Sequence, residues 1–84
     1  MAKWKRKTYV VEAMKWTGDN YNELKEFGGG DIRKYNGCVF YDTPETNGVL
    51  NRGEIVIKHY FDDNSVAGLE VMSEESFLES YEPV

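Results

Sequence analysis

Residues 54–72, "EIVIKHYFDDNSVAGLEVM", have the pattern of two β-strands joined by a short turn. β-Branched and aromatic residues predominate at positions 55–61, a composition typical of a strand. The polar run 62–65, "DDNS", predicts a four-residue turn, and 66–72 then returns as the partner strand. Alternation assigns the side chains to faces: Ile55, Ile57, His59 and Phe61 share one, Val56, Lys58 and Tyr60 the other, and Ala67, Leu69 and Val71 one face of the partner. We therefore predict an antiparallel hairpin.

Residues 8–16, "TYVVEAMKW", predict a further strand, with one acid, Glu12, at its centre. The sequence offers no acid–base partner for this carboxylate. We expect Glu12 to have a structural role and to pair with Lys15, Arg33 or backbone donors rather than transfer protons.

The next segment, "TGDNYNELKEFGGG" (17–30), predicts a short helix. Asp19 or Asn20 can serve as the N-cap, and Glu23 stands at the capping-box spacing from Asn20. Gly28 is a natural stop. One core-facing stripe is expected, formed by Tyr21, Leu24 and Phe27.

A second hairpin is predicted in "DIRKYNGCVFYDT" (31–43), because Asn36-Gly37 suits the positive φ angles of a type I′ turn. This turn places Tyr35 opposite Cys38 and Arg33 opposite Phe40. Residues 44–48, "PETNG", are a loop by composition, and Val49-Leu50 form a short strand before a turn near 51–53.

The C-terminal "SEESFLESYEPV" (73–84) predicts a short helix with Ser73 as N-cap. Phe77, Leu78 and Tyr81 are expected to pack on the sheet, and Pro83 ends any helix. The predicted fold class is α+β: one domain over residues 1–84, with a small antiparallel sheet of about five strands and one or two short helices on one face.

Composition indicates a globular chain, with 40% apolar and 14% aromatic residues among 84. Cys38 is the only cysteine, which favours a reducing compartment. Since no apolar run approaches the ~18 residues of a membrane span, we expect no membrane association and a cytoplasmic location.

Charge is distributed unevenly along the chain. Lys3, Lys5, Arg6 and Lys7 contribute +4 to a net charge of −5, so the rest carries −9. General nucleic-acid binding is disfavoured, because such proteins carry a basic stripe along the domain. We expect residues 1–7 to form a flexible, solvated N-terminus, with phosphate contact as the alternative. From Asp62 onward seven acids and no base follow, which suits docking to a basic protein surface or imitation of DNA phosphates.

No catalytic, metal or cofactor site is predicted. His59 is the only histidine, and no serine or cysteine lies beside it in sequence, so a nucleophile, base and orienting group cannot be assembled without assuming a fold. One His and one Cys cannot supply the ligands of a zinc site. The acids near Asp42 and Asp63 lack the EF-hand pattern and read as turn residues.

Cationic and aromatic residues together form the predicted ligand-binding set. Guanidinium groups grip phosphate and aromatic rings stack on bases, so two or three such groups can hold a small nucleotide if they converge. The set is Trp16, Arg33, Tyr35, Arg52, Lys58 and Tyr60, with Lys34 beside them. The structural alternative is a group of ordinary solvent-facing sheet residues. A homo-oligomer formed through a surface bearing Val56, Tyr60 and Met72 is a further possibility.

The two ends of the chain carry motifs. "KTYVVEAMKWTGDN" precedes the first helix, and "RGEIVIK" is followed by "SFLESYEPV". They resemble those of a loose group of small phage and prophage proteins of Gram-positive bacteria, which look like [KR]-x-x-x-V-E-A-x-x-W-T-G-[DN] at the front and P-G-D-W-I-[IV]-x-G, then F-x-x-x-Y-E-P-V, at the back. In this chain the front motif corresponds to Val11, Glu12, Ala13, Trp16, Thr17, Gly18 and Asp19. The back motif corresponds to Gly53, Glu54, Phe77, Tyr81, Glu82, Pro83 and Val84.

The resemblance covers about half of the chain and leaves out the middle. Arg52, Glu54 and Ile55 stand where the group has proline, aspartate and tryptophan. The group carries no established activity, and what the resemblance implies is a phage origin.

Three functional hypotheses follow. The leading one is a non-enzymatic binding protein that antagonises a bacterial defence, by sequestering a nucleotide immune signal in a pocket of an oligomer. The second is an acidic inhibitor of a host protein. An enzyme that degrades such a signal through His59 is the least favoured.

Overall fold

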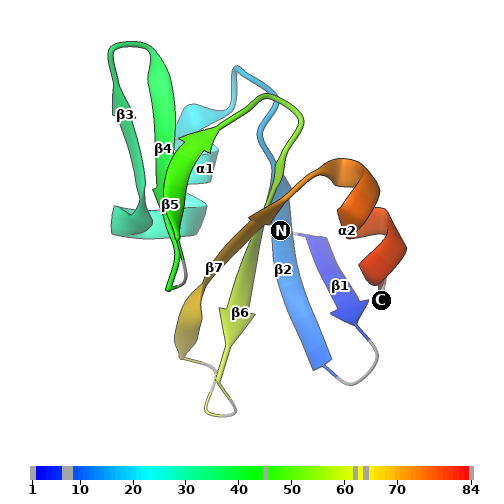
Figure 1. Cartoon of the computed structure of the whole chain (residues 1–84). Helices are drawn as coiled ribbons and strands as arrows, with labels where there is room; N and C mark the ends of the chain where they lie inside the picture. Colours follow the sequence, from blue (N-terminus) through cyan, green and yellow to red (C-terminus); the bar gives the residue numbers. More distant parts are fainter. Residues whose placement is uncertain (1, 7–8, 45, 62, 64, 84) are drawn as a thin grey trace.

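The computed structural model describes residues 2–6, 9–44, 46–61, 63 and 65–83. These residues form an α+β fold of two antiparallel sheets and two helices (Figure 1). The large sheet has the strand order β7-β6-β2-β1-β8, and the small sheet has the order β3-β4-β5. The α+β class is confirmed, but a single sheet of about five strands is wrong, since the large sheet alone has five and the small sheet adds three.

The strands of the large sheet come from the two ends of the chain and from residues 55–72. They are β1 (Ala2–Arg6), β2 (Tyr9–Lys15), β6 (Ile55–Tyr60), β7 (Val66–Met72) and β8 (Glu82–Pro83). The segment 1–7, for which the charges predicted a flexible terminus, thus includes β1, which pairs with β2 and β8. Residues 1 and 7 lie outside the described part.

The predicted hairpin of β6 and β7 is confirmed. Ile55 pairs with Met72 and Ile57 with Glu70, and the register shifts between His59 and Tyr60. Residues 62 and 64 of the expected turn lie outside the described residues. Asp63 Oδ1 accepts hydrogen bonds from the backbone N and the hydroxyl of Ser65, at 3.0 and 2.6 Å, which lower the pKa of the Asp63 carboxyl.

The small sheet contains β3 (Ile32–Tyr35), β4 (Cys38–Asp42) and β5 (Asn47–Leu50). Asn36 and Gly37 have φ angles of 52° and 78°, and Tyr35 lies opposite Cys38, as the turn chemistry predicted. A 3₁₀ turn (Gly29–Asp31) joins β3 to α1 (Tyr21–Gly28). β5 begins at Asn47, inside the predicted loop 44–48.

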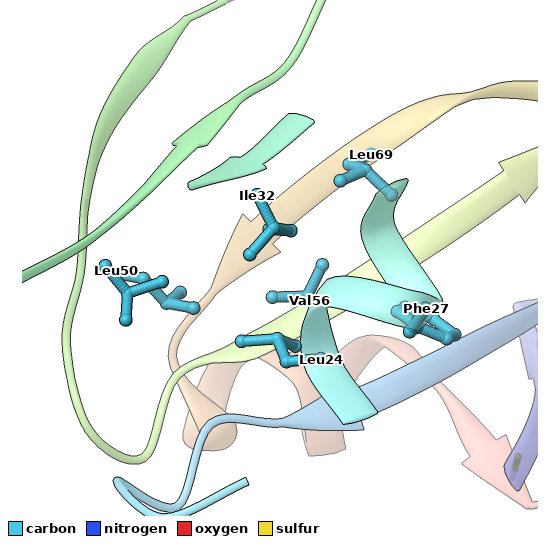
Figure 2. Packing of buried hydrophobic residues seen from close by; sticks show 7 residues of the cluster. Leu24, Phe27, Ile32, Leu50, Val56 and Leu69 are labelled. Atoms are coloured by element: carbon cyan, nitrogen blue, oxygen red, sulfur yellow. The ribbon is translucent and has the colours of Figure 1, made fainter. Parts of the chain in front are cut away.

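The first core lies between one face of the large sheet, α1 and the small sheet. Leu24 and Phe27 of α1 meet Val56 of β6, and Figure 2 shows Ile32 and Leu50 of the small sheet closing over them. Its buried members are Leu24, Phe27, Ile32, Val39, Leu50, Val56 and Leu69.

The second core lies on the opposite face of the large sheet, beneath α2 (Glu74–Ser80). Phe77 of α2 stacks on Tyr81, with ring centroids 5.0 Å apart. The buried members are Val11, Ala13, Ile55, Ile57, Phe77 and Tyr81. The expectation that helices cover one face is therefore wrong: α1 and α2 cover opposite faces, which is why Ile55, Val56 and Ile57 are all buried.

The helix ends only partly follow the predicted caps. Ser73 Oγ accepts from Ser76 N at 3.2 Å, as predicted. Asn20 is the N-cap of α1 by position, but its side chain makes no cap hydrogen bond. Instead it closes the preceding loop, accepting from Thr17 N at 3.0 Å and donating to Lys15 O at 2.8 Å, so the predicted capping box is wrong. Leu78, expected to pack on the sheet, is 57% exposed. In the described part of the chain, neither helix has the length and apolar character needed to cross a bilayer.

Candidate functional site

The six predicted ligand residues lie in three pairs rather than in one pocket. Trp16 and Arg52 flank one corner of the large sheet, Lys58 and Tyr60 lie on β6, and Arg33 and Tyr35 lie on β3. A single chain therefore does not bring all six together.

The Trp16–Arg52 corner is held by backbone hydrogen bonds. Trp16 N donates to Glu54 O at 2.9 Å, and Gly53 N donates to Trp16 O at 2.7 Å. The Arg52 guanidinium lies against Gly18, where a Cβ would come within 2.5 Å of Nε. Trp16 packs half-buried on the first core. Both side chains thus have structural contacts within the chain.

Lys58 and Tyr60 form a cluster with Glu12. Lys58 lies opposite Glu12 in the register of β2 and β6, and its Nζ is 4.7 Å from the centroid of the Phe27 ring and 5.9 Å from that of Tyr60. The Tyr60 hydroxyl donates to Glu12 Oε1. Burial, followed by this bond and the carboxylate charge, raises the pKa of Tyr60 to about 12, so Tyr60 stays a protonated donor near neutral pH.

The prediction that Glu12 pairs with Lys15 or Arg33 is wrong. Lys15 instead contacts Glu74 at 3.3 Å, and Arg33 contacts Asp42 at 2.8 Å. Glu12 accepts from a phenol, which supports its predicted structural role.

The third pair belongs to a continuous surface, the outer face of the small sheet. Residues opposite each other in an antiparallel pair, and residues two apart on a strand, share a face. Arg33 therefore shares a face with Phe40 and Val49, its neighbours across the strands. The outer face comprises Arg33, Tyr35, Cys38, Phe40, Asp42, Asn47 and Val49.

This outer face is open to solvent, because the alternate residues of the same strands fill the first core. Tyr35 is 70% and Val49 is 46% exposed, whereas Ile32 on the opposite face is 0% exposed. The Arg33 side chain, paired with Asp42, is 60% exposed. Exposed aromatic and apolar side chains beside one guanidinium fork suit stacking and bidentate anion binding. Sequence reasoning found Arg33 and Tyr35 but missed Val49, whose place depends on pairing across the 43–46 loop.

A hollow of about 470 Å³ lies beside β7, the edge strand of the large sheet. Tyr41, Thr43 and Thr46 line it on one side, and His59 and Glu70 on the other. His59 Nε2 lies 2.9 Å from Glu70 Oε1. Its described lining contains no Lys or Arg, so the hollow offers an anionic ligand no cation other than a protonated imidazole.

The surface of α2 is negatively charged. Glu74, Glu75 and Glu79 are exposed on this helix, around Leu78. Across the described residues, His, Cys, Asp and Glu side chains nowhere gather in a group of three that could hold a metal ion.

The surface predicted for oligomerisation is absent. Val56 is 0% exposed because it belongs to the first core, and Met72 pairs with Ile55 and packs on the second core, on the other face of the sheet. Val56, Tyr60 and Met72 therefore cannot share one docking surface.

No protein-family model matches the chain, and neither a curated protein nor a solved structure matches it. The resemblance to phage proteins stays a prediction from the end motifs.

Proposed function

We propose that the chain is a phage-encoded, non-enzymatic binding protein that antagonises a bacterial defence by sequestering a small nucleotide signal. The observation that supports nucleotide binding is the pair Arg33 and Tyr35 on the outer face of the small sheet. These residues are two positions apart on β3, so their Cα atoms are about 7 Å apart. A base can stack on the exposed Tyr35 ring while the Arg33 fork binds a phosphate.

The Arg33 guanidinium can exchange its present partner, the Asp42 carboxylate, for a phosphate. Its ion pair with Asp42 is largely exposed, and such pairs contribute about 0–1 kcal/mol, so a phosphodiester or diphosphate group can replace the carboxylate. For the same reason Arg33→Ala should leave the protein folded.

The test compares one cation from each predicted pair: Arg33→Ala, Arg52→Ala and Lys58→Ala. Thermal melting is followed with cyclic dinucleotides and ADP-ribose-type nucleotides, since ligand at 100 times Kd adds about 2.7 kcal/mol. We expect the wild type, Arg52→Ala and Lys58→Ala to be stabilised by one nucleotide class, and Arg33→Ala not to be. Loss of stabilisation in Arg52→Ala alone would move the site to the Trp16 corner. No stabilisation of the wild type by any nucleotide would reject sequestration.

The acidic surface of α2 supports a second candidate, an inhibitor that binds a basic host protein. Glu75 and Glu79 are exposed beside Leu78, which offers an apolar anchor within a ring of negative charge.

Capture from host lysate tests this candidate with a matched control. The double variant Glu75→Lys/Glu79→Lys reverses charge on α2, and Glu23→Lys/Glu26→Lys makes the same change at exposed positions of α1. We expect the wild type and the α1 variant to retain one host protein that added salt releases, and the α2 variant to lose it. Capture that resists salt, or equal capture by both variants, would exclude docking through α2.

A further inference from the structure

The outer face of the small sheet is an unpartnered apolar surface. Tyr35, Cys38 and Val49 are exposed, and Phe40 lies half-buried between them. Monomeric proteins seldom expose contiguous apolar patches larger than about a few hundred Å². We propose that a second copy of the chain covers this face, forming a two-fold symmetric dimer. This inference goes beyond the proposed function, and no step of it uses a nucleotide.

Charge on the face selects a second copy as the occupant. Arg33 and Asp42 lie on the same face and cancel, so the face is neutral within a chain of net charge −5. In a two-fold contact each surface meets itself, so Arg33 of one copy can approach Asp42 of the other. The acidic surface around α2 would instead meet its own like charge.

One edge of the small sheet, strand β3, agrees with face-to-face contact. Arg33 and Lys34 on edge strand β3 discourage strand addition, as basic residues commonly do at sheet edges. The two copies then stack through side chains rather than extend one sheet.

The small size of the outer face limits the affinity of the dimer. Seven residues per copy form the outer face, whereas a standard stable interface uses about 20–30 residues a side. We therefore expect a weak, reversible dimer with a Kd weaker than about 1 μM. Such a dimer covers the face that carries Arg33 and Tyr35, so dimerisation and nucleotide binding at this pair compete.

Sedimentation velocity from micromolar to millimolar protein, without nucleotide, tests the dimer. Val49→Lys inserts a charge into the face, and Val66→Lys is its matched control, because Val66 is likewise a strand valine, 52% exposed, but on β7. We expect the wild type and Val66→Lys to shift from monomer to dimer and Val49→Lys to stay monomeric. A wild type that remains monomeric throughout, or dimerisation lost only in Val66→Lys, would overturn the proposal.

Cys38 gives a second readout that needs no substitution. It is the chain's only cysteine and is exposed on the outer face. Its alkylation rate should fall as protein concentration rises through the dimer transition. A rate independent of concentration, in a protein that dimerises by sedimentation, would place the interface elsewhere. Because both measurements omit nucleotide, their failure is separate from that of sequestration.

Discussion

Replacing Tyr60 by phenylalanine removes one hydroxyl and tests how β2 and β6 are held together. That hydroxyl donates to the Glu12 carboxylate across the two central strands. Hydrogen bonds to charged groups contribute about 1.5–3 kcal/mol, and both side chains keep some contact with water. We expect Tyr60→Phe to lose about 1–1.5 kcal/mol at pH 7, which for a domain of this size is roughly 4–12 °C in Tm.

The pH dependence makes the prediction sharper. The pKa of Tyr60 is raised from 10.0 to about 12, because burial and Glu12 disfavour the phenolate. Below pH 10 both the folded and unfolded states hold the proton, so the stabilisation is fully present. Between pH 10 and 12 the folded state holds the proton more tightly, so stability falls as pH rises. Two pKa units correspond to about 2.7 kcal/mol, which partial exposure reduces to about 1–2 kcal/mol.

Urea unfolding of the wild type, Tyr60→Phe and Tyr35→Phe between pH 7 and 11.5 measures this difference. The advantage of the wild type over Tyr60→Phe should stay constant to about pH 10 and then shrink. Tyr35, 70% exposed, provides the control, and its variant should track the wild type throughout. A constant difference between wild type and Tyr60→Phe up to pH 11.5 would refute the assigned contact.

Three further substitutions test the packing by urea unfolding. In Gly28→Ala the new Cβ would lie 2.2 Å from Ile32 Cγ1, so we expect a loss of about 1–3 kcal/mol, where helix propensity alone predicts a gain. Phe77→Ala should cost about 3–5 kcal/mol by opening the second core; less than 1 kcal/mol would mean that α2 is not docked there. Ser73→Ala should cost about 1 kcal/mol through the lost bond to Ser76, whereas Ser80→Ala, at the other end of α2, should be near neutral.

The sequence predicted the features that depend on neighbouring residues. Asn36-Gly37 determines its hairpin because only a few residue types accept positive φ, and the same turn correctly placed Arg33 opposite Phe40. Ser73 likewise caps α2 through a bond three residues away. Alternation correctly placed Ile55 and Ile57 on one face and Val56 on the other. The apolar run Ile55–Ile57 is also typical of a strand covered on both faces, a signal that the expectation of helices on one face overlooked.

Features that depend on distant segments were not predictable in this way. β8 has two residues and exists through its pairing with β1 at the other end of the chain. The division into two sheets depends on the corner where Gly53, at φ 94°, bonds back to Trp16. The ligand set failed to converge for the same reason: the small sheet turns Arg33 away from the core that holds Lys58 over Phe27.

The layer order separates the two candidate surfaces and makes salt a discriminating variable. Figure 1 shows the small sheet and α2 on opposite sides of the large sheet. Packed layers are about 10 Å apart, so roughly 20 Å lies between the outer face and α2, more than two Debye lengths at physiological ionic strength. The acids of α2 therefore repel an anion at Arg33 only in dilute buffer. Docking through α2 should weaken steadily as salt rises, whereas association through the neutral outer face should change little. Salt screens both the attraction of a phosphate to the Arg33 guanidinium and its repulsion by the distant acids of α2. Because these two effects oppose each other, phosphate binding at Arg33 should depend less steeply on salt than docking through α2.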